Sequence, residues 1–316
     1  MAFKTQKKVA LVIGGSRGIG RQVCIDLAKN GYAVVVSGKS LSDAATVRPF
    51  PPDPNSSQST ASTVAREITE AGGSAHPLAV DTRDPASIDA LFAAAWAHYG
   101  RLDALIYNAG AIWWASVANT PMRRFRLMQQ VNVEGLYAAV QAALPYFAKG
   151  GWRARVIVVS PPIYSRFFRG KTAYAMGKVG MSVLTKGLAM DWVREGRPDM
   201  AITSIWPASA IESAATNAAS NDPEERKDLR HPAIFSDAML AMLAAPPVTV
   251  NGLIDTDEDF LRRHAGVTNF SRYALVPGSS PRRMMPAEFP SLEVAEQTDE
   301  GKRMDSTLVP RRGAKL

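Results

Sequence analysis

Short apolar runs alternate with amphipathic segments from residue 9 to about residue 255. The runs are rich in Val, Ile and Ala, as in strands that are buried on both faces of a parallel sheet. They cover residues 9–13, 33–37, 76–80, 104–107, 156–159, 201–205 and about 250–255. The segments between them have helical spacing and cover residues 21–30, 62–71, 85–98, 121–148, 172–194 and 236–245. This alternation predicts one α/β domain with a doubly wound parallel sheet and right-handed crossovers.

Three stretches break the alternation. Residues 40–62 hold four prolines followed by Asn-Ser-Ser-Gln-Ser-Thr, which predicts an inserted, mobile surface loop. Residues 207–230 also lack a regular period, and we expect them to be flexible. From residue 280 the periodicity is lost, prolines intervene and charges alternate. We therefore predict a domain over residues 1–279 and a disordered tail over residues 280–316.

A glycine-rich stretch directly follows the first apolar run and precedes the first helical segment. Glycines let the backbone approach a phosphate, and a helix start offers free N–H groups and the positive end of its dipole. This order predicts a Rossmann-type site for the pyrophosphate of a nucleotide cofactor. The predicted contacts are Gly14, Ser16, Arg17, Gly18, Ile19 and Gly20.

The spacing Gly-x3-Gly-x-Gly resembles that of the short-chain dehydrogenase/reductase family. Three later motifs carry the same resemblance: Asn108-Ala109-Gly110, Asn132 and Tyr174-Ala-Met-Gly-Lys178. They follow the family's order and spacing over residues 8 to about 255. Residues 160–162, 174–181 and 206–211 are similar to the hydroxysteroid dehydrogenase-like protein 2 subgroup. That subgroup often carries a C-terminal lipid-carrier domain, and we expect this chain to end too soon to hold one.

Lys39 follows the second predicted strand, where an acidic residue would accept hydrogen bonds from the ribose diol of NAD. With Arg17 in the glycine loop it favours a doubly charged 2′-phosphate, so we predict NADP(H) as the cofactor. The alternative is a solvated lysine and an arginine that caps a helix. The resemblance implies further cofactor contacts from Asp81 (adenine), Asn108 (adenosine), Pro207 and Ile211 (nicotinamide carboxamide), with Ser213 in place of a usual Thr.

Tyr174 and Lys178 are four residues apart on a predicted helix, so they share one face. A phenol has a pKa of about 10 and needs a nearby cation to exchange protons at neutral pH. Lys178 and an oxidised nicotinamide would supply that charge, which suits proton transfer with an alcohol or carbonyl during hydride transfer. By resemblance, Asn132 would hold a water that links Lys178 to solvent. The alternatives are a surface tyrosine beside a solvated lysine, and a buried core amide at Asn132.

The fourth catalytic position departs from the family. The family places a serine thirteen residues before the tyrosine, and Pro161 stands there in this chain. We predict that the neighbouring Ser160 polarises the substrate oxygen, with Ser165 as a second candidate. The alternative for Ser160 is a strand-end serine that caps a turn.

Bulky apolar residues gather in the two loops that flank the predicted site. If they face the cleft, the pocket is large and aromatic and suits a lipid-like carbonyl compound; the alternative is ordinary packing. The residues are Trp113, Trp114, Ile163, Tyr164, Phe167 and Phe168.

Composition excludes several classes of protein. The net charge is +8, but the basic residues are interleaved with acidic ones, so we expect no nucleic-acid binding. No apolar run approaches the roughly 18–20 residues of a membrane span, and the apolar stretch after the basic N-terminus is a strand rather than a signal sequence. The single cysteine, Cys24, forms no internal disulfide and is expected to be a buried hydrophobe. No metal site is predicted.

These observations predict an NADP(H)-dependent oxidoreductase that interconverts an apolar ketone or aldehyde and its alcohol. The alternative is a non-catalytic NADPH-binding regulatory or assembly protein with the same fold. By resemblance, helices 121–148 and 172–194 would form the interface of a homodimer or homotetramer. The ending Ala314-Lys315-Leu316 is a variant of the Ser-Lys-Leu peroxisomal address, read by an import receptor. We therefore expect a peroxisomal protein; a chance basic terminus on a cytoplasmic protein is the alternative.

Overall fold

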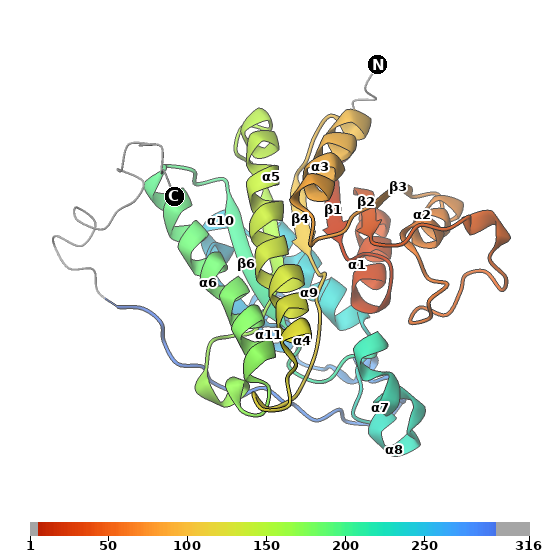
Figure 1. The fold of residues 1–316 in the computed structure, drawn as a ribbon, viewed down its shortest axis with the longest axis vertical. Coiled ribbons are helices and arrows are strands. Elements are labelled where there is room, and N and C mark those ends of the chain that lie inside the picture. Colours follow the sequence, from red (N-terminus) through yellow and green to blue (C-terminus); the bar gives the residue numbers. More distant parts are fainter. Residues whose placement is uncertain (1–5, 295–316) are drawn as a thin grey trace.

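The computed structural model describes residues 6–294, and a seven-stranded, all-parallel sheet forms its centre (Figure 1). The strand order is β3-β2-β1-β4-β5-β6-β7. The strands are β1 (Val9–Ile13), β2 (Ala33–Gly38), β3 (Ser74–Ala79), β4 (Ala104–Tyr107), β5 (Arg155–Val159), β6 (Ala201–Trp206) and β7 (Ile254–Thr256). The order reverses between β1 and β4, which creates a crevice at the carboxyl edge of the sheet. The predicted doubly wound fold is confirmed, and β7 is shorter than expected.

Helices cover both faces because alternate strand residues point in opposite directions. Val9, Leu11 and Ile13 of β1 pack on one face, while Ala10 and Val12 pack on the other. One face is covered by α1 (Gly18–Lys29), α2 (Ala61–Glu70) and α9 (Ala233–Ala244). The opposite face is covered by α3 (Pro85–Tyr99), α5 (Gly135–Lys149) and α6 (Thr172–Arg194).

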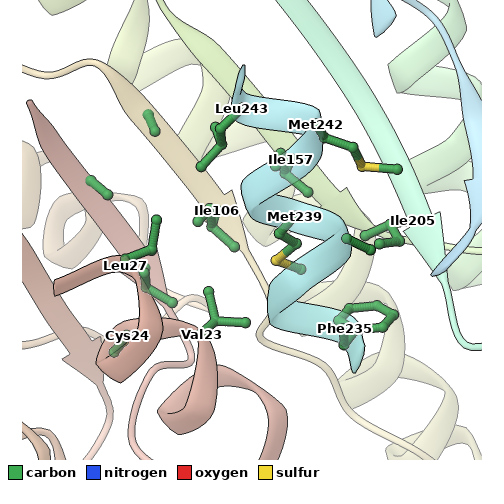
Figure 2. Close-up of a cluster of buried hydrophobic side chains, with 14 of the residues drawn as sticks. Val23, Cys24, Leu27, Ile106, Ile157, Ile205, Phe235, Met239, Met242 and Leu243 are labelled. Carbon is green, nitrogen blue, oxygen red and sulfur yellow. The ribbon is translucent and has the colours of Figure 1, made fainter. Parts of the chain in front are cut away.

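The α9 helix closes the first of these two cores (Figure 2). Its Phe235 and Met239 face Val23 and Leu27 of α1 and the strand residue Ile106. The side chains are at most 1% exposed, and this packing holds α1 rigidly against the sheet. The glycine loop at the start of α1 is fixed by the same contacts.

The predicted helix 121–148 is divided into three parts. These are α4 (Met122–Gln129), a π-helical turn (Gln130–Glu134) and α5. The Tyr107 hydroxyl, at the end of β4, donates a 2.5 Å hydrogen bond to the carbonyl of Val131 inside the turn. A Cβ at Gly135 would lie 2.4 Å from that hydroxyl, so glycine permits the close approach. Such turns widen the hydrogen-bond ladder and often occur at functional sites.

The insertion at residues 40–60 is docked rather than loose, which corrects our expectation of a mobile loop. The Gly18 amide donates to the carbonyl of Pro54 at 3.1 Å, and the Ser59 hydroxyl donates to the carbonyl of Ser16 at 2.7 Å. Arg66 of α2 also lies 3.8 Å from the Phe50 ring centre. The insertion therefore supports the glycine loop.

Short elements complete the carboxyl edge. They are α7 (Asn217–Asn221), α8 (Pro223–Arg226), α10 (Pro247–Val250) and α11 (Asp257–His264), with 3-10 turns at Ala44–Thr46, Ser165–Phe168, Ala214–Thr216 and Ser271–Tyr273. The α11 helix was not predicted, since it continues directly from β7 without a loop. None of the helices within residues 6–294 is long and apolar enough to cross a membrane.

Residues 280–294 of the expected tail follow the body of the protein (Figure 1). They form no helix or strand, as the lost periodicity indicated, but they are anchored. Arg283 pairs with Asp259 of α11 at 2.6 Å, the Met284 amide donates to the carbonyl of Ala208, and Met285 is buried. This part of the expected tail is therefore held against the domain at Arg283, Met284 and Met285, and the domain boundary at residue 279 stays a prediction. Residues 295–316, with Ala314-Lys315-Leu316, lie outside the described residues.

Candidate active site

The glycine loop packs tightly against the turn after β4. Gly14 has φ +88°, and a Cβ there would lie 2.7 Å from the amide nitrogen of Ala109. A Cβ at Gly20 would lie 2.0 Å from the carbonyl oxygen of Gly14. The Asn108 side-chain amide donates to that same carbonyl at 2.9 Å. Asn108 thus holds the loop in the shape that fits a dinucleotide diphosphate at the start of α1.

A cavity of about 490 Å³ lies beside this loop at the carboxyl edge of the sheet. The structure brings six predicted cofactor residues together in its lining: Gly14, Ser16, Arg17, Lys39, Asp81 and Asn108. Gly18, Ile19 and Gly20, in the first turn of α1, do not belong to this lining. The space and the donors fit the adenosine half of a nicotinamide cofactor.

Arg83 is a cation of this cavity that sequence reasoning missed. It forms a bidentate pair with Asp81, and Lys39 lies 3.5 Å from the same carboxylate. The hydrogen bonds from Arg83 hold the pKa of the Asp81 carboxyl well below its usual range. The only available signal was its place two residues after Asp81, at the end of β3.

Tyr174 and Lys178 lie one turn apart in the first half of α6, and both are buried. Burial raises the pKa of the Tyr174 phenol, so its anion forms only beside a positive charge. The ammonium of Lys178 donates a 2.9 Å hydrogen bond to the carbonyl of Val159, at the end of β5. Burial lowers the pKa of Lys178 to about 7, so the lysine can lose its proton near neutral pH.

Asn132 links the π-helical turn to this pair. Its Oδ1 accepts from the amide of Ala111 at 3.0 Å, and its Nδ2 donates to the carbonyl of Ala111 at 3.1 Å. A Cβ at Gly110 would lie 3.2 Å from the ammonium of Lys178 and 3.4 Å from Oδ1 of Asn132. Asn132 therefore fixes the loop that runs past Lys178, and the two side chains share one small space.

Ser160 is not where we predicted. Its side chain is fully buried, and its hydroxyl shares hydrogen bonds with Ser204 of β6 at 2.8 Å and Ser182 of α6 at 3.0 Å. These bonds direct the Ser160 hydroxyl into the layer between the sheet and α6. The prediction that Ser160 polarises a substrate is therefore wrong. Ser165, the second candidate, is exposed in the 3-10 turn after β5. Pro161 carries no hydroxyl, so no serine is identified for this role.

The stretch from Pro207 runs over the end of β6 toward the glycine loop. Asp257 anchors it by accepting a 2.8 Å hydrogen bond from the amide of Ala208. Ile211 points into the core, and the side chain of Ser213 meets the position of a Gly18 Cβ at 3.3 Å. Pro207 and Ile211 do not line the adenosine cavity, so the carboxamide contact implied by resemblance stays a prediction.

An aromatic cluster packs around Tyr174 and shares no residue with the lining of the adenosine cavity. The ring centre of Tyr174 lies 6.2 Å from that of Trp114 and 6.4 Å from that of Phe167. Trp113, Tyr164 and Phe168 pack against the same cluster. Ile163 does not; it lines a groove beside α6 with Val183 and Leu292. Met285 also belongs to the cluster. The sequence did not indicate this, because the stretch from residue 280 has no regular spacing of apolar residues.

A model of the family described as short chain dehydrogenase matches residues 8–49 and 55–224. The chain belongs to this family. Human hydroxysteroid dehydrogenase-like protein 2 is 33% identical to this short-chain dehydrogenase/reductase over 269 residues, which are 84% of this chain and 60% of the human protein. The zebrafish (Danio rerio) protein of the same name gives the same figures. The chain thus spans about 60% of the length of these curated relatives.

Solved structures agree with the fold. A short chain dehydrogenase from Mycobacterium thermoresistibile is 31% identical with a TM-score of 0.75, over 90% of this chain and 96% of that chain. A protein from Xanthomonas campestris is 30% identical with a TM-score of 0.74, over 94% of this chain and 100% of that chain. The gap in the family match, residues 50–54, falls inside the docked insertion. The family that this match shows is one of dehydrogenases, which interconvert carbonyl and alcohol groups with a nicotinamide cofactor.

Proposed function

We propose that this oxidoreductase uses NADP(H) to interconvert a ketone or aldehyde and its alcohol on an apolar, lipid-like molecule. The observation that carries the proposal is the buried Tyr174–Lys178 pair: Tyr174 belongs to the aromatic cluster, and the Lys178 ammonium lies next to Gly110 in the lining of the adenosine cavity. One side of the pair fits the cofactor, and the other fits an apolar substrate.

The residues divide the work as follows. When bound, the nicotinamide supplies the hydride that reduces a carbonyl carbon. Tyr174 donates its proton to the carbonyl oxygen, and Lys178 offsets the negative charge left on the phenol. Because the pKa of Lys178 lies at about 7, the ammonium can also pass a proton on toward Tyr174. In the oxidative direction Tyr174 accepts the proton of the alcohol.

Three cations support the choice of NADP(H). Arg17, Lys39 and Arg83 line the adenosine cavity, and one carboxylate, Asp81, faces them. The excess of positive charge suits a 2′-phosphate better than a free ribose diol.

The test is NADPH oxidation by the purified protein with a panel of apolar ketones and aldehydes. We expect turnover by the native chain, and loss of at least about a thousand-fold in Tyr174→Phe, because the proton donor is removed. Binding of NADPH, measured by fluorescence, should be preserved in the variant. Equal turnover in both proteins would remove Tyr174 from the mechanism.

The non-catalytic alternative is favoured by one observation, the proline at position 161 where the family has a serine. A regulatory protein of this kind would bind NADPH tightly and leave every carbonyl in the panel unchanged. The same assay therefore separates the two candidates.

We also propose a homo-oligomer and a peroxisomal location. Exposed apolar residues on α5 and α6 support the first proposal. The second rests on Ala314-Lys315-Leu316, outside the described residues. A fluorescent protein fused to the N-terminus should reach peroxisomes with Leu316 present and should remain cytoplasmic when the tripeptide is deleted; identical distributions would contradict the proposal.

A further inference from the structure

The segments that flank Tyr174 are more basic than the chain as a whole. Residues 109–133 and 160–180 contain seven lysines and arginines and no aspartate or glutamate. Over the whole chain, 37 basic residues are opposed by 29 acidic ones. The interleaving of charges that we expected from the sequence therefore fails at the substrate side of the site.

Lys171 precedes Tyr174 by three residues. Its ammonium lies 4.3 Å from the ring centre of Phe167 and 5.8 Å from that of Trp114. Among residues 6–294 it contacts no carboxylate, and burial lowers its pKa. It also stands at the N-terminus of α6, the end of a helix where the dipole disfavours a cation. Stability alone therefore does not explain this lysine.

Arg124 is a second cation that lies over an aromatic ring. It lies in the first turn of α4, with its guanidinium 4.6 Å from the ring centre of Trp113. No ion pair of Arg124 occurs within the part of the chain that the structure describes. The indole Nε1 of Trp113 is itself buried without an acceptor. Trp113 packs against the aromatic cluster that contains Phe167 and Tyr174, so both cations border this cluster.

These groups are separate from the cofactor's phosphate sites. The adenosine cavity has its own cations, and neither Lys171 nor Arg124 belongs to its lining. Two partly buried cations on aromatic faces, and an indole N–H without an acceptor between the rings of the same cluster, favour the binding of an anion at the edge of this cluster.

We propose that the substrate carries an anionic group, a carboxylate or a phosphate, which binds Lys171 and Arg124 while its carbonyl carbon lies at Tyr174. This inference rests on the proposed oxidoreductase function. In the free protein the aromatic rings hold the ammonium of Lys171 and the guanidinium of Arg124 in place. In the complex these two groups bind the anion, and the apolar part of the substrate covers the rings.

The test compares three substrates with one carbon skeleton: a medium-chain keto carboxylic acid, its methyl ester and the corresponding keto alkyl phosphate. We expect a higher kcat/KM for an anion than for the ester. Lys171→Met and Arg124→Met should each lower kcat/KM for the anion about ten- to a hundred-fold, mainly through KM, and leave the ester within about two-fold. Preference for the acid or for the phosphate identifies which anion is used.

Lys149→Met is the matched control. The Lys149 ammonium also lies over aromatic rings, 4.9 Å from Tyr146 and 5.6 Å from Trp96, but at the last residue of α5. Lys149→Met should leave kcat/KM unchanged for all three substrates. Equal kcat/KM for anion and ester in the native protein, or equal loss of both in Lys171→Met, would overturn the inference and leave the oxidoreductase function standing.

Calorimetry separates the inference from the proposed function. A medium-chain fatty carboxylate should bind the native protein and bind Lys171→Met at least about ten-fold more weakly. If that result is obtained and none of the three keto compounds is reduced, the anion site stands and the catalytic proposal fails. If the carboxylate binds neither protein, or binds both equally, the anion site is wrong.

Discussion

Lys39 is the residue on which cofactor choice should depend. Replacing it by Asp removes one charge-assisted contact to a 2′-phosphate and adds repulsion between that phosphate and the new carboxylate, which would stand beside Asp81. We expect the Kd for NADPH to rise about ten- to a hundred-fold while the Kd for NADH changes much less. Lys29→Asp makes the same charge change at the far end of α1 and should affect neither cofactor. Parallel losses for both cofactors in Lys39→Asp would refute the assignment.

Ser160 is predicted to matter for stability rather than turnover. Ser160→Ala removes a hydroxyl that is shared with Ser204 and Ser182, but these keep partners in Thr185 and in the carbonyl of Pro161. We expect a loss of about 1–2 kcal/mol in the free energy of unfolding, seen in urea titrations. The kcat should stay within about two-fold of the native value. A hundred-fold fall in kcat with unchanged stability would return Ser160 to the active site.

Among the elements, the docked insertion is predicted to act on the cofactor. Ser59→Ala removes the bond to the carbonyl of Ser16 and loosens the glycine loop. We expect NADPH to bind about three- to ten-fold more weakly, the effect of one hydrogen bond of roughly 1 kcal/mol. Ser56→Ala is the control, because its hydroxyl bonds only to Asp53 within the insertion. Unchanged NADPH affinity in Ser59→Ala would mean that the insertion merely covers the loop.

Elements with a strong local signal were predictable. The β1 strand, α6 and the glycine turn carry their period and their breakers in the sequence itself. The docking of residues 40–60 was not, because prolines and polar residues define a loop without saying what it touches. The orientation of Ser160 depends on β6 and α6, far along the chain, and the π-helical turn depends on one hydroxyl from Tyr107. Contacts of this kind are tertiary, so no local pattern records them.

For the whole molecule, the outer face of α6 predicts self-association. Met176, Val183 and Met190 are seven residues apart, so they form one stripe, and each is about half exposed or more. Such a stripe is typical of an interface between chains. We expect Val183→Asp to shift the mass measured by light scattering from an oligomer to a monomer. Val248→Asp on α10, which is 86% exposed, should leave the mass unchanged. A native protein that is already monomeric would contradict the prediction.

The anchored segment after residue 280 adds no strand or helix to the fold, but it contributes side chains to the aromatic cluster around Tyr174. A protein shortened after residue 279 would keep every strand, the glycine loop and the adenosine cavity. It would lose Met285, whose sulfur accepts a hydrogen bond from the Tyr164 hydroxyl, and the ring of Phe289 that packs on Tyr164. Such a shortened protein would look sound by circular dichroism and cofactor titration. A substrate screen carried out with it would, however, test an aromatic cluster that lacks Met285 and Phe289, so its hits would not report the specificity of the longer chain.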